Sequence, residues 1–229
     1  DFVLDLKSLN AKALRVRVDD ETSGTLMNFS LKRADIQIDT LNIVNKYISI
    51  ADLDLDGPEI QMINRLPIGE PIAASATSAK PWSINVDSWR LTNGKIKIDN
   101  RTKPALFYPN GRGIDYAHMV LEDLDIRMDS LIVRGWDFKA KDVDIHALHQ
   151  NGFEINTLAA ARAAISREGI ILDDLKIRTA DSEIRNSISF LFSGYTDFKS
   201  FVDSVGLAIP EANIRLRVND LLSIAPGLQ

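Results

Sequence analysis

The 229-residue sequence has no cysteine, which excludes disulfide bonds, thiolate metal sites and a cysteine nucleophile and leaves the cellular compartment open. It has no cluster of basic residues and a formal net charge of −5, which argues against nucleic acid as a partner. No apolar run approaches the roughly 18 residues of a membrane-spanning helix, and no signal peptide is visible. The chain starts with the strand-like DFVLDL, so we expect it to be an internal piece of a longer protein.

Sequence signatures of catalysis and of metal binding are also missing. There is no G-x-S-x-G, no glycine-rich phosphate loop and no paired-carboxylate signature, so we predict a protein that is not an enzyme and has no catalytic residues or cofactor. The DLDLDG segment at 52–57 resembles the start of a calcium loop, but Pro58 stands at its seventh position and Ile63 at its twelfth. His146 and His149 have a spacing that suits neighbours on a helix, and their segment is strand-like. We therefore predict no metal site.

The composition, with 45% hydrophobic and 26% charged residues, is typical of a globular protein with a sizeable core. Apolar and polar residues alternate along much of the chain, which predicts long, amphipathic, antiparallel strands and an all-β fold. One large all-β unit is as plausible at this length as two small domains, and we treat residues 1–229 as one elongated unit. The three tryptophans could stack on a sugar, but we interpret them as residues that pack on an apolar sheet face.

The segment WSINVDSWRLTNGKIKIDN, residues 82–100, predicts a β-hairpin. Asn-Gly between two alternating runs is a strong signal for a two-residue turn, since both residues must take a positive φ. With Asn93 and Gly94 in the turn, Leu91 would pair with Ile96, and Trp89 with Ile98. The alternation changes phase between Val86 and Trp89, so we also expect a bulge near Ser88.

The same pattern occurs earlier in the chain, which predicts an internal repeat of residues 2–56 and 82–145. With an offset of 80, Arg15 to Val18 align with Lys95 to Ile98, and Ser8, Asp19 and Thr22 recur unchanged. With an offset of 90, ADIQIDTL at 34–41 aligns with LDIRMDSL at 124–131. The difference between the offsets is an insertion around YPNGRGIDY. The first copy has Ala13 and Leu14 in place of Asn-Gly, so its turn must differ.

Outside the repeat, the signals are weaker. Residues 64–81, with three prolines and a run of small residues, read as a linker or surface loop. A third strand-rich unit is expected over 153–229, with a short helix at 197–205 and a second one after Asn219. The segment NTLAAARAAISRE, starting at Asn156, has helical propensity, but the strands on both sides favour a strand.

Nearly every predicted strand has one apolar face, and the sequence offers little helix to cover it. Periodicity alone favours a sandwich or barrel, in which the sheet packs on itself. The alternative is a long curved sheet whose apolar face stays partly open to bind an apolar ligand. Strand parity places the following residues on one apolar surface: Leu4, Ile36, Ile38, Trp82, Ile84, Val86, Trp89, Leu91, Ile96, Ile98, Ile126 and Met128.

Three segments together resemble a known family: the tandem amphipathic pattern around LTNGKIKID, the stretch EGIILDDLKIRTADSEIRNSISF, and the closing ANIRLRVNDLLSIAP. Their spacing of apolar and polar residues resembles that of the AsmA-like superfamily of Gram-negative envelope proteins, and most of all that of its TamB branch. The similarity spans nearly the whole chain but involves no rigid motif, and it carries no catalytic position.

The resemblance implies a curved open sheet, a taco-like groove, in the periplasm, within a parent protein anchored in the inner membrane by a segment outside this piece. It implies phospholipid acyl chains as the ligand and lipid transport to the outer membrane as the function. An alternative is a scaffold that binds outer-membrane assembly proteins and helps to build β-barrels. The other alternative is an ordinary β-sandwich binding module.

Overall fold

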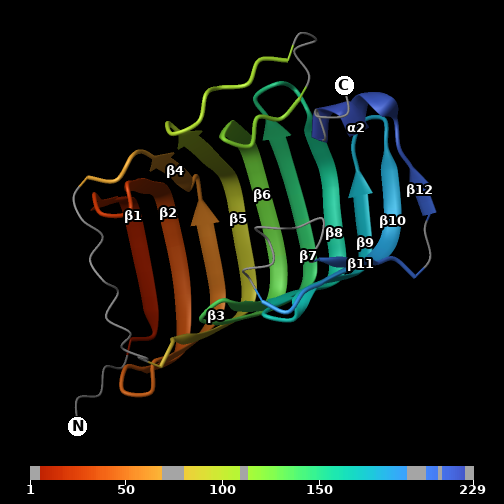
Figure 1. The fold of residues 1–229 in the computed structure, drawn as a ribbon. Helices are drawn as coiled ribbons and strands as arrows, with labels where there is room; N and C mark the ends of the chain where they lie inside the picture. Colours follow the sequence, from red (N-terminus) through yellow and green to blue (C-terminus); the bar gives the residue numbers. More distant parts are fainter. Residues whose placement is uncertain (1–5, 69–79, 109–112, 195–204, 211–212, 225–229) are drawn as a thin grey trace.

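The computed structural model describes residues 6–68, 80–108, 113–194, 205–210 and 213–224. These residues form one twelve-stranded sheet with one short helix (Figure 1), so the predicted all-β class is confirmed. No helix in this part of the chain has the length and apolar character needed to cross a membrane.

The elements, in chain order, are β1 (Ser8–Asp20), β2 (Thr25–Asn42), β3 (Tyr47–Asp56), β4 (Glu59–Asn64), β5 (Ser83–Asn100), β6 (His118–Arg134), β7 (Asp137–His149), β8 (Glu154–Ser166), β9 (Gly169–Arg178), β10 (Glu183–Leu191), β11 (Gly206–Ala208), β12 (Asn213–Arg215) and α2 (Val218–Ile224). The strand order is β1-β2-β3-β5-β6-β7-β8-β9-β10-β11, with β4 beside β2 and β5 and with β12 beside β10. Most neighbours are consecutive in sequence and antiparallel. The two ends of the sheet, β1 and the β10–β12 group, are not paired with each other in the described residues.

The strands are not all antiparallel as the sequence predicted, because β5 runs parallel to β3 and β4. Strands β3 and β4 lie in line along β2, interrupted at Gly57 and Pro58. After β4 the chain must return to the end of the sheet where β3 starts before β5 can begin, because Ser83 pairs beside Tyr47. The predicted linker at 64–81 belongs to this return connection, since parallel neighbours need a crossover of a dozen or more residues. Its residues 69–79 lie outside the described part of the chain.

The predicted hairpin at Asn93 and Gly94 is wrong, because β5 continues through both residues. Asn93 has the expected positive φ, 56°, but Gly94 does not, and a two-residue turn of this type needs both. The register with β6 shifts on either side of Gly94, which makes the site a bulge. A larger residue would be crowded there, because a Cβ at Gly94 would lie 2.7 Å from Leu91 Cδ2 and 3.0 Å from the carbonyl oxygen of Leu124. Leu91 therefore pairs with Ile126 and Trp89 with Met128, not with Ile96 and Ile98.

Strand β1 likewise runs without a turn through Ala13 and Leu14, with a φ of 53° at Ala13. The real turn comes at its end, where the Thr22 hydroxyl donates a hydrogen bond to Asp20 Oδ1 at 2.7 Å. Eighty residues later, the Thr102 hydroxyl donates one to Asn100 Oδ1 at 2.6 Å. The positive φ and the turn bond thus recur at the predicted offset of 80. The superposition of 2–56 on 82–145, with Trp89 over Leu9 and Ile126 over Ile36, stays a prediction.

Two short elements predicted near the C-terminal end can be compared with the structure. The alanine-rich segment forms β8, as the neighbouring strands suggested, and the expected second helix is α2. Most of the helix predicted at 197–205 lies outside the described residues; of its positions only Val205 is described, as irregular backbone before β11.

Candidate functional site

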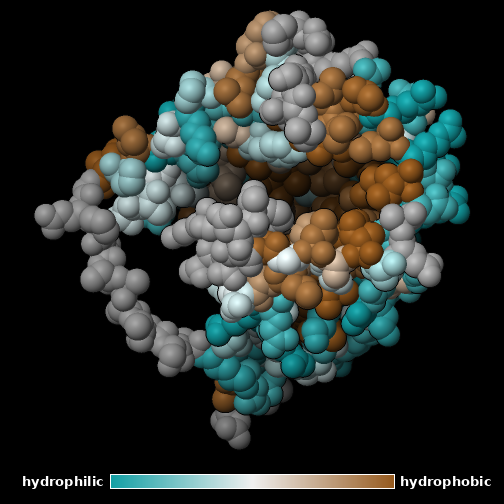
Figure 2. Space-filling view, turned by 45° about the vertical axis from the view of Figure 1, so that its right-hand side comes forward, coloured by the Kyte–Doolittle hydropathy of each residue, from teal (hydrophilic) through white to brown (hydrophobic). Residues whose placement is uncertain are grey.

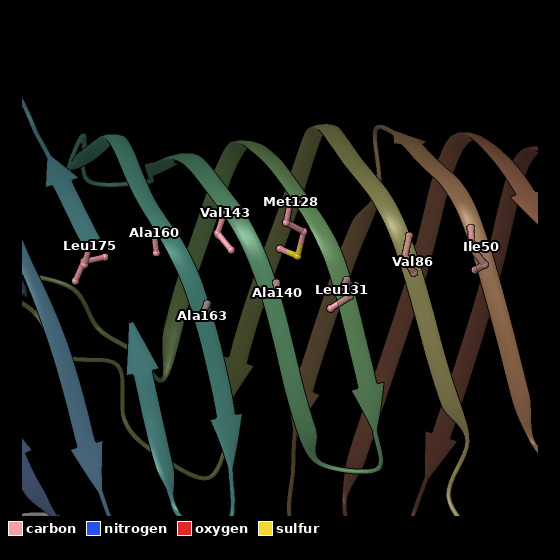
Figure 3. Packing of buried hydrophobic residues seen from close by; sticks show 9 residues of the cluster. All are labelled: Ile50, Val86, Met128, Leu131, Ala140, Val143, Ala160, Ala163 and Leu175. Carbon is pink, nitrogen blue, oxygen red and sulfur yellow. The ribbon is translucent and has the colours of Figure 1, made fainter. Parts of the chain in front are cut away.

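Apolar side chains from eight strands gather on one face of the sheet, which we call the inner face. Its buried residues are Ile50, Val86, Met128, Leu131, Ala140, Val143, Ala160, Ala163 and Leu175 in one cluster (Figure 3) and Leu91, Leu124 and Ala147 in another. Half-buried apolar residues pack against both clusters. The inner face therefore runs continuously from β2 to β10.

Most of the predicted surface residues lie on this inner face. Those found in or against the two clusters are Ile36, Ile84, Val86, Trp89, Leu91, Ile96, Ile126 and Met128. Ile38 is buried opposite Ile50, and Ile98 lies opposite Met119. Trp82 differs, since it is 41% exposed and lies just before β5 begins. Leu4 lies outside the described residues.

The inner face includes residues that the sequence analysis did not select, on strands β7 to β9. The reason is a change of phase within each strand. Residues i and i+3 of a regular strand point to opposite faces. Strands β5 to β9 nevertheless place such pairs together: Val86 with Trp89, Met128 with Leu131, Ala140 with Val143, Ala160 with Ala163 and Leu172 with Leu175.

This change of phase forms a transverse row across the sheet. Ser130, Asp142 and Asp174 in this row have φ values of 50°, 47° and 49°, and we call them the switch row. Pairing registers shift beside them, between Arg127 and Ile132 on β6 and between Asn186 and Ile188 on β10. The phase change predicted between Val86 and Trp89 is confirmed, because both residues pack in one cluster. The bulge expected near Ser88 is not found, since β5 keeps one register with β3 and with β6 from Val86 to Trp89. The register shifts on β6 and β10 are of the kind that bends a sheet.

The inner face is only partly shielded. Many of its residues, such as Ile36, Ile84 and Ile126, are half-buried even though they belong to the core cluster. In Figure 2 the surface is hollowed, with hydrophobic residues inside the hollow and hydrophilic residues around the outside. The described residues form no second sheet that could cover this face.

Two side-chain donors on the inner face have no hydrogen-bond partner among the described residues: Trp89 Nε1 and Asn186 Nδ2. Asn186 is 8% exposed and lies opposite Leu175. A depression of about 650 Å³ opens beside Asn186 at the β10 edge, with Leu175, Pro210 and Asn213 in its wall. A buried unpaired donor costs about 1–3 kcal/mol, so these atoms are candidates for contact with a ligand.

The opposite face of the sheet is charged. Arg162 Nε lies 2.6 Å from Asp173 across β8 and β9, and Lys95 Nζ lies 2.6 Å from Glu122 across β5 and β6. The hydrogen bond and charge of Glu122 raise the pKa of Lys95. Such exposed pairs contribute little stability, and they identify this face as the solvated one.

The loop between β5 and β6 crosses to the C-terminal helix at one rim of the sheet. Ile114 N donates to Ser223 O at 2.8 Å, and the Tyr116 hydroxyl donates to Ile224 O at 2.7 Å. Asp115 holds the loop itself, since its carboxylate accepts bonds from Leu106 N at 2.8 Å and Ala117 N at 3.0 Å. His118 Nδ1 lies 3.0 Å from the same carboxylate.

This anchoring predicts an acid-sensitive loop. Burial alone would raise the pKa of Asp115, but the hydrogen bonds of Leu106, His118 and Ala117 to the carboxylate outweigh burial and lower it. Because the pKa of Asp115 is lower in the folded state than in the unfolded state, its carboxylate stabilises the fold above the usual aspartate pKa. This stabilisation is lost as the pH falls through the folded-state pKa. We expect the amide NMR signals of Leu106 and Ala117 to titrate together below the usual aspartate range. In Asp115→Ala that titration should vanish; if it persists, another carboxylate anchors the loop.

The residues considered as metal ligands do not come together. His149 is buried and its Nδ1 accepts a hydrogen bond from Asn151 N at 3.2 Å, whereas His146 Nε2 lies 3.8 Å from Glu154. The described residues contain no group of three or more potential His, Asp or Glu ligands close enough to hold a metal ion. Trp136, interpreted as packed, is 82% exposed.

Comparison with known proteins gives no matching family model, no similar curated protein and no similar solved structure. The assignment of a function therefore depends on the geometry of the inner face and on the sequence resemblance.

Proposed function

We propose that this chain is a periplasmic β-groove segment that shields phospholipid acyl chains and conducts them between the inner and outer membranes. The observation that carries this proposal is a single sheet whose apolar inner face has no second layer over it in the described residues. The resemblance to the TamB branch of AsmA-like envelope proteins points to the same function and to a parent protein anchored in the inner membrane.

The energetics of lipid transfer suit such a surface. An acyl chain of about fifteen methylenes costs roughly 12 kcal/mol to place in water, at about 0.8 kcal/mol for each methylene. A continuous apolar face removes most of this barrier. The cluster residues on successive strands offer sites of similar character, so that a chain can slide without a deep trap. No catalytic residue is needed for this function.

The unpartnered donors add a means of orienting the lipid. Trp89 Nε1 and Asn186 Nδ2 are hydrogen-bond donors, and the ester carbonyl oxygens of a phospholipid are acceptors. Such a pair would satisfy donors that the described residues leave unpaired. The spacing of the two along the sheet, from β5 to β10, gives the lipid more than one polar contact on its path.

The proposal predicts that charge on the inner face removes lipid while the fold survives. Ile96 and Ile126 are half-buried, so an aspartate at either position keeps contact with water. In Ile96→Asp and Ile126→Asp we expect thermal unfolding to remain cooperative and co-purifying phospholipid, measured by mass spectrometry, to fall at least about tenfold. Lys97→Asp is the matched control, since it puts the same residue on the charged face next to Ile96 and should retain lipid.

Two results would contradict this proposal. One is a wild-type protein that carries no phospholipid and takes up none from vesicles. The other is equal loss of lipid in Lys97→Asp and Ile96→Asp, which would attribute the loss to strand weakening and not to the inner face.

A scaffold for outer-membrane β-barrel assembly is the second candidate, and one observation favours it. The thirteen-residue strand β1 pairs only with β2 in the described residues, which leaves its other edge open to a client strand. However, Lys12, Arg15 and Arg17 lie on this exposed strand, and such charges commonly protect an edge from pairing. Binding of a β-signal peptide that is abolished by a proline at Val16 would favour the scaffold over the groove.

A further inference from the structure

One rim of the sheet carries an exposed apolar patch that the inner face does not explain. It consists of Ile43 and Val44 in the β2–β3 turn, Trp82 before β5, and Trp136 in the β6–β7 turn, and we call it the tryptophan rim. These side chains are 51%, 90%, 41% and 82% exposed, respectively. Exposed tryptophan together with exposed valine at turn tips is unusual for a surface that faces only water.

The tryptophan rim is contiguous, because the three segments contact one another. Ser83 N donates a hydrogen bond to Lys46 O at 2.8 Å, which joins the β2–β3 turn to the start of β5. A Cβ on Gly135 would lie 3.4 Å from Pro81, which places the Trp136 turn beside the residue before Trp82. These turns follow the lower edge of the sheet in Figure 1.

The charge of this rim differs from that of the whole protein. Lys46, Lys80 and Arg134 lie within or beside the three segments, and Asp137 is the acidic residue at the same turns. Arg134 Nε donates to the Ser83 hydroxyl at 3.2 Å, which holds the guanidinium group at the rim. A locally basic, aromatic rim in a protein with a net charge of −5 matches an anionic lipid surface.

The opposite rim lacks this character at its short turns. The β1–β2 turn contains Asp20 and Thr22, and Asp20 is held ionised because hydrogen bonds from Thr22 and Ser23 lower its pKa to about 2. The β7–β8 and β9–β10 turns are also polar. An exception is Phe107 in the β5–β6 loop, which is 89% exposed.

We infer that the tryptophan rim docks the protein onto the surface of a bilayer that contains anionic lipid. Tryptophan is suited to the interface between headgroups and acyl chains, with its ring in the apolar layer and its N–H toward water. The basic residues contact the headgroups, while Ile43 and Val44 enter the apolar boundary. At exposures of 51%, 90%, 41% and 82%, four side chains of at most about 250 Å² each offer no more than about 660 Å², which falls short of the roughly 800 Å² per partner that a stable protein dimer buries. The docking goes beyond lipid shielding, since it needs the turns and not the inner face.

Flotation of the 229-residue chain with vesicles tests this inference. The vesicles are phosphatidylcholine alone or phosphatidylcholine mixed with phosphatidylglycerol. We expect the wild type to float with the mixed vesicles, Trp136→Ser and Val44→Ser each to bind roughly tenfold more weakly, and Arg134→Gln to bind about fivefold more weakly to the mixed vesicles. Phe107→Ser is the matched control, because it removes an equally exposed aromatic residue from the other rim, and it should bind like the wild type.

Ile126→Asp separates this inference from the proposed function. If both are correct, Ile126→Asp loses bound phospholipid but floats like the wild type, whereas Trp136→Ser keeps its bound lipid and binds the vesicles roughly tenfold more weakly. A wild type that fails to float, or a Phe107→Ser variant as weak as Trp136→Ser, overturns the docking rim and leaves lipid shielding standing. A concentration-dependent dimer that Trp136→Ser abolishes would instead show that a second copy of the chain covers the rim. That result would overturn the inference that the rim docks onto a bilayer.

Discussion

Leu175→Asp is expected to abolish the folded state at ordinary temperature. Leu175 is 1% exposed, lies in the large cluster and pairs with Asn186 on β10. The substitution removes a buried leucine, at about 2–5 kcal/mol, and buries a carboxylate in its place, at several kcal/mol more, because the neutral amide of Asn186 opposite does not neutralise the charge. That total is comparable with the roughly 5–15 kcal/mol that stabilises a typical domain. Circular dichroism and thermal unfolding should show a protein without a cooperative transition.

The comparison with neighbouring positions makes this result informative. Lys176→Asp puts the same residue on the charged face one position later and should unfold near the wild-type temperature. Ile126 is on the same inner face but half-buried. The unfolding temperature of Ile126→Asp should therefore be much closer to that of Lys176→Asp than to that of Leu175→Asp. If Ile126→Asp and Leu175→Asp unfold the protein equally, the inner face is sealed throughout and has no room for acyl chains.

The strands could be predicted from the sequence because alternation survives over long stretches of each one. The fate of Asn93 and Gly94 could not, because the Asn-Gly signal is local and the outcome depends on β6. Asn93 N donates to Asp125 Oδ1 at 2.9 Å and its side chain donates to Asp56 Oδ1 at 2.8 Å, so residues on two other strands satisfy the bulge. The Asn-Gly pair alone carries no information about these partners on other strands, so it could not predict the bulge.

The inner face, too, could be predicted from the sequence only in part. Its residues on β2, β5 and β6 were predictable, because two aligned copies of the pattern fixed the phase. Those on β7 to β9 were not, because the i, i+3 spacing of Ala160 and Ala163 imitates a helix and only the neighbouring strands show it to be a phase change. The crossover before β5 was also hidden, since parallel pairing of β3 with β5 is set by the length of the connection and not by alternation.

The switch row explains how such a sheet can bend while keeping one face apolar. Ser130, Asp142 and Asp174 are exposed non-glycine residues in the left-handed region, which costs about 1–2 kcal/mol for each. Asp and Ser tolerate this conformation better than most residues because their side chains hydrogen-bond locally. Part of the cost is offset between strands, since Asp174 N donates to the Ser187 hydroxyl at 3.1 Å. The row therefore stores strain that the packing of Met128, Val143 and Leu175 maintains.

A triple variant, Ser130→Val, Asp142→Val and Asp174→Val, is expected to lose about 3–6 kcal/mol of stability. Valine favours ordinary strands but is strongly disfavoured at a positive φ, so each substitution opposes the phase change. The corresponding triple glycine variant should stay within about 1 kcal/mol of the wild type, because glycine adopts this φ freely and the exposed side chains contribute little packing. Urea unfolding measures the free energy of unfolding of both triple variants.

The control is a triple valine variant at outward-facing positions of the same strands with ordinary φ: the exposed Asp129 and Asp144 and the half-buried Lys176. Valine there suits the strand, so stability should stay equal or rise. If the two valine triples behave alike, the loss reflects surface polarity and not the backbone, and the switch row does not shape the sheet. A shift by one residue would turn every apolar side chain of a strand outward. If the wild type carries phospholipid, as we propose, and the switch-row variant stays folded but loses it, the phase change is what holds the inner face in register for the lipid.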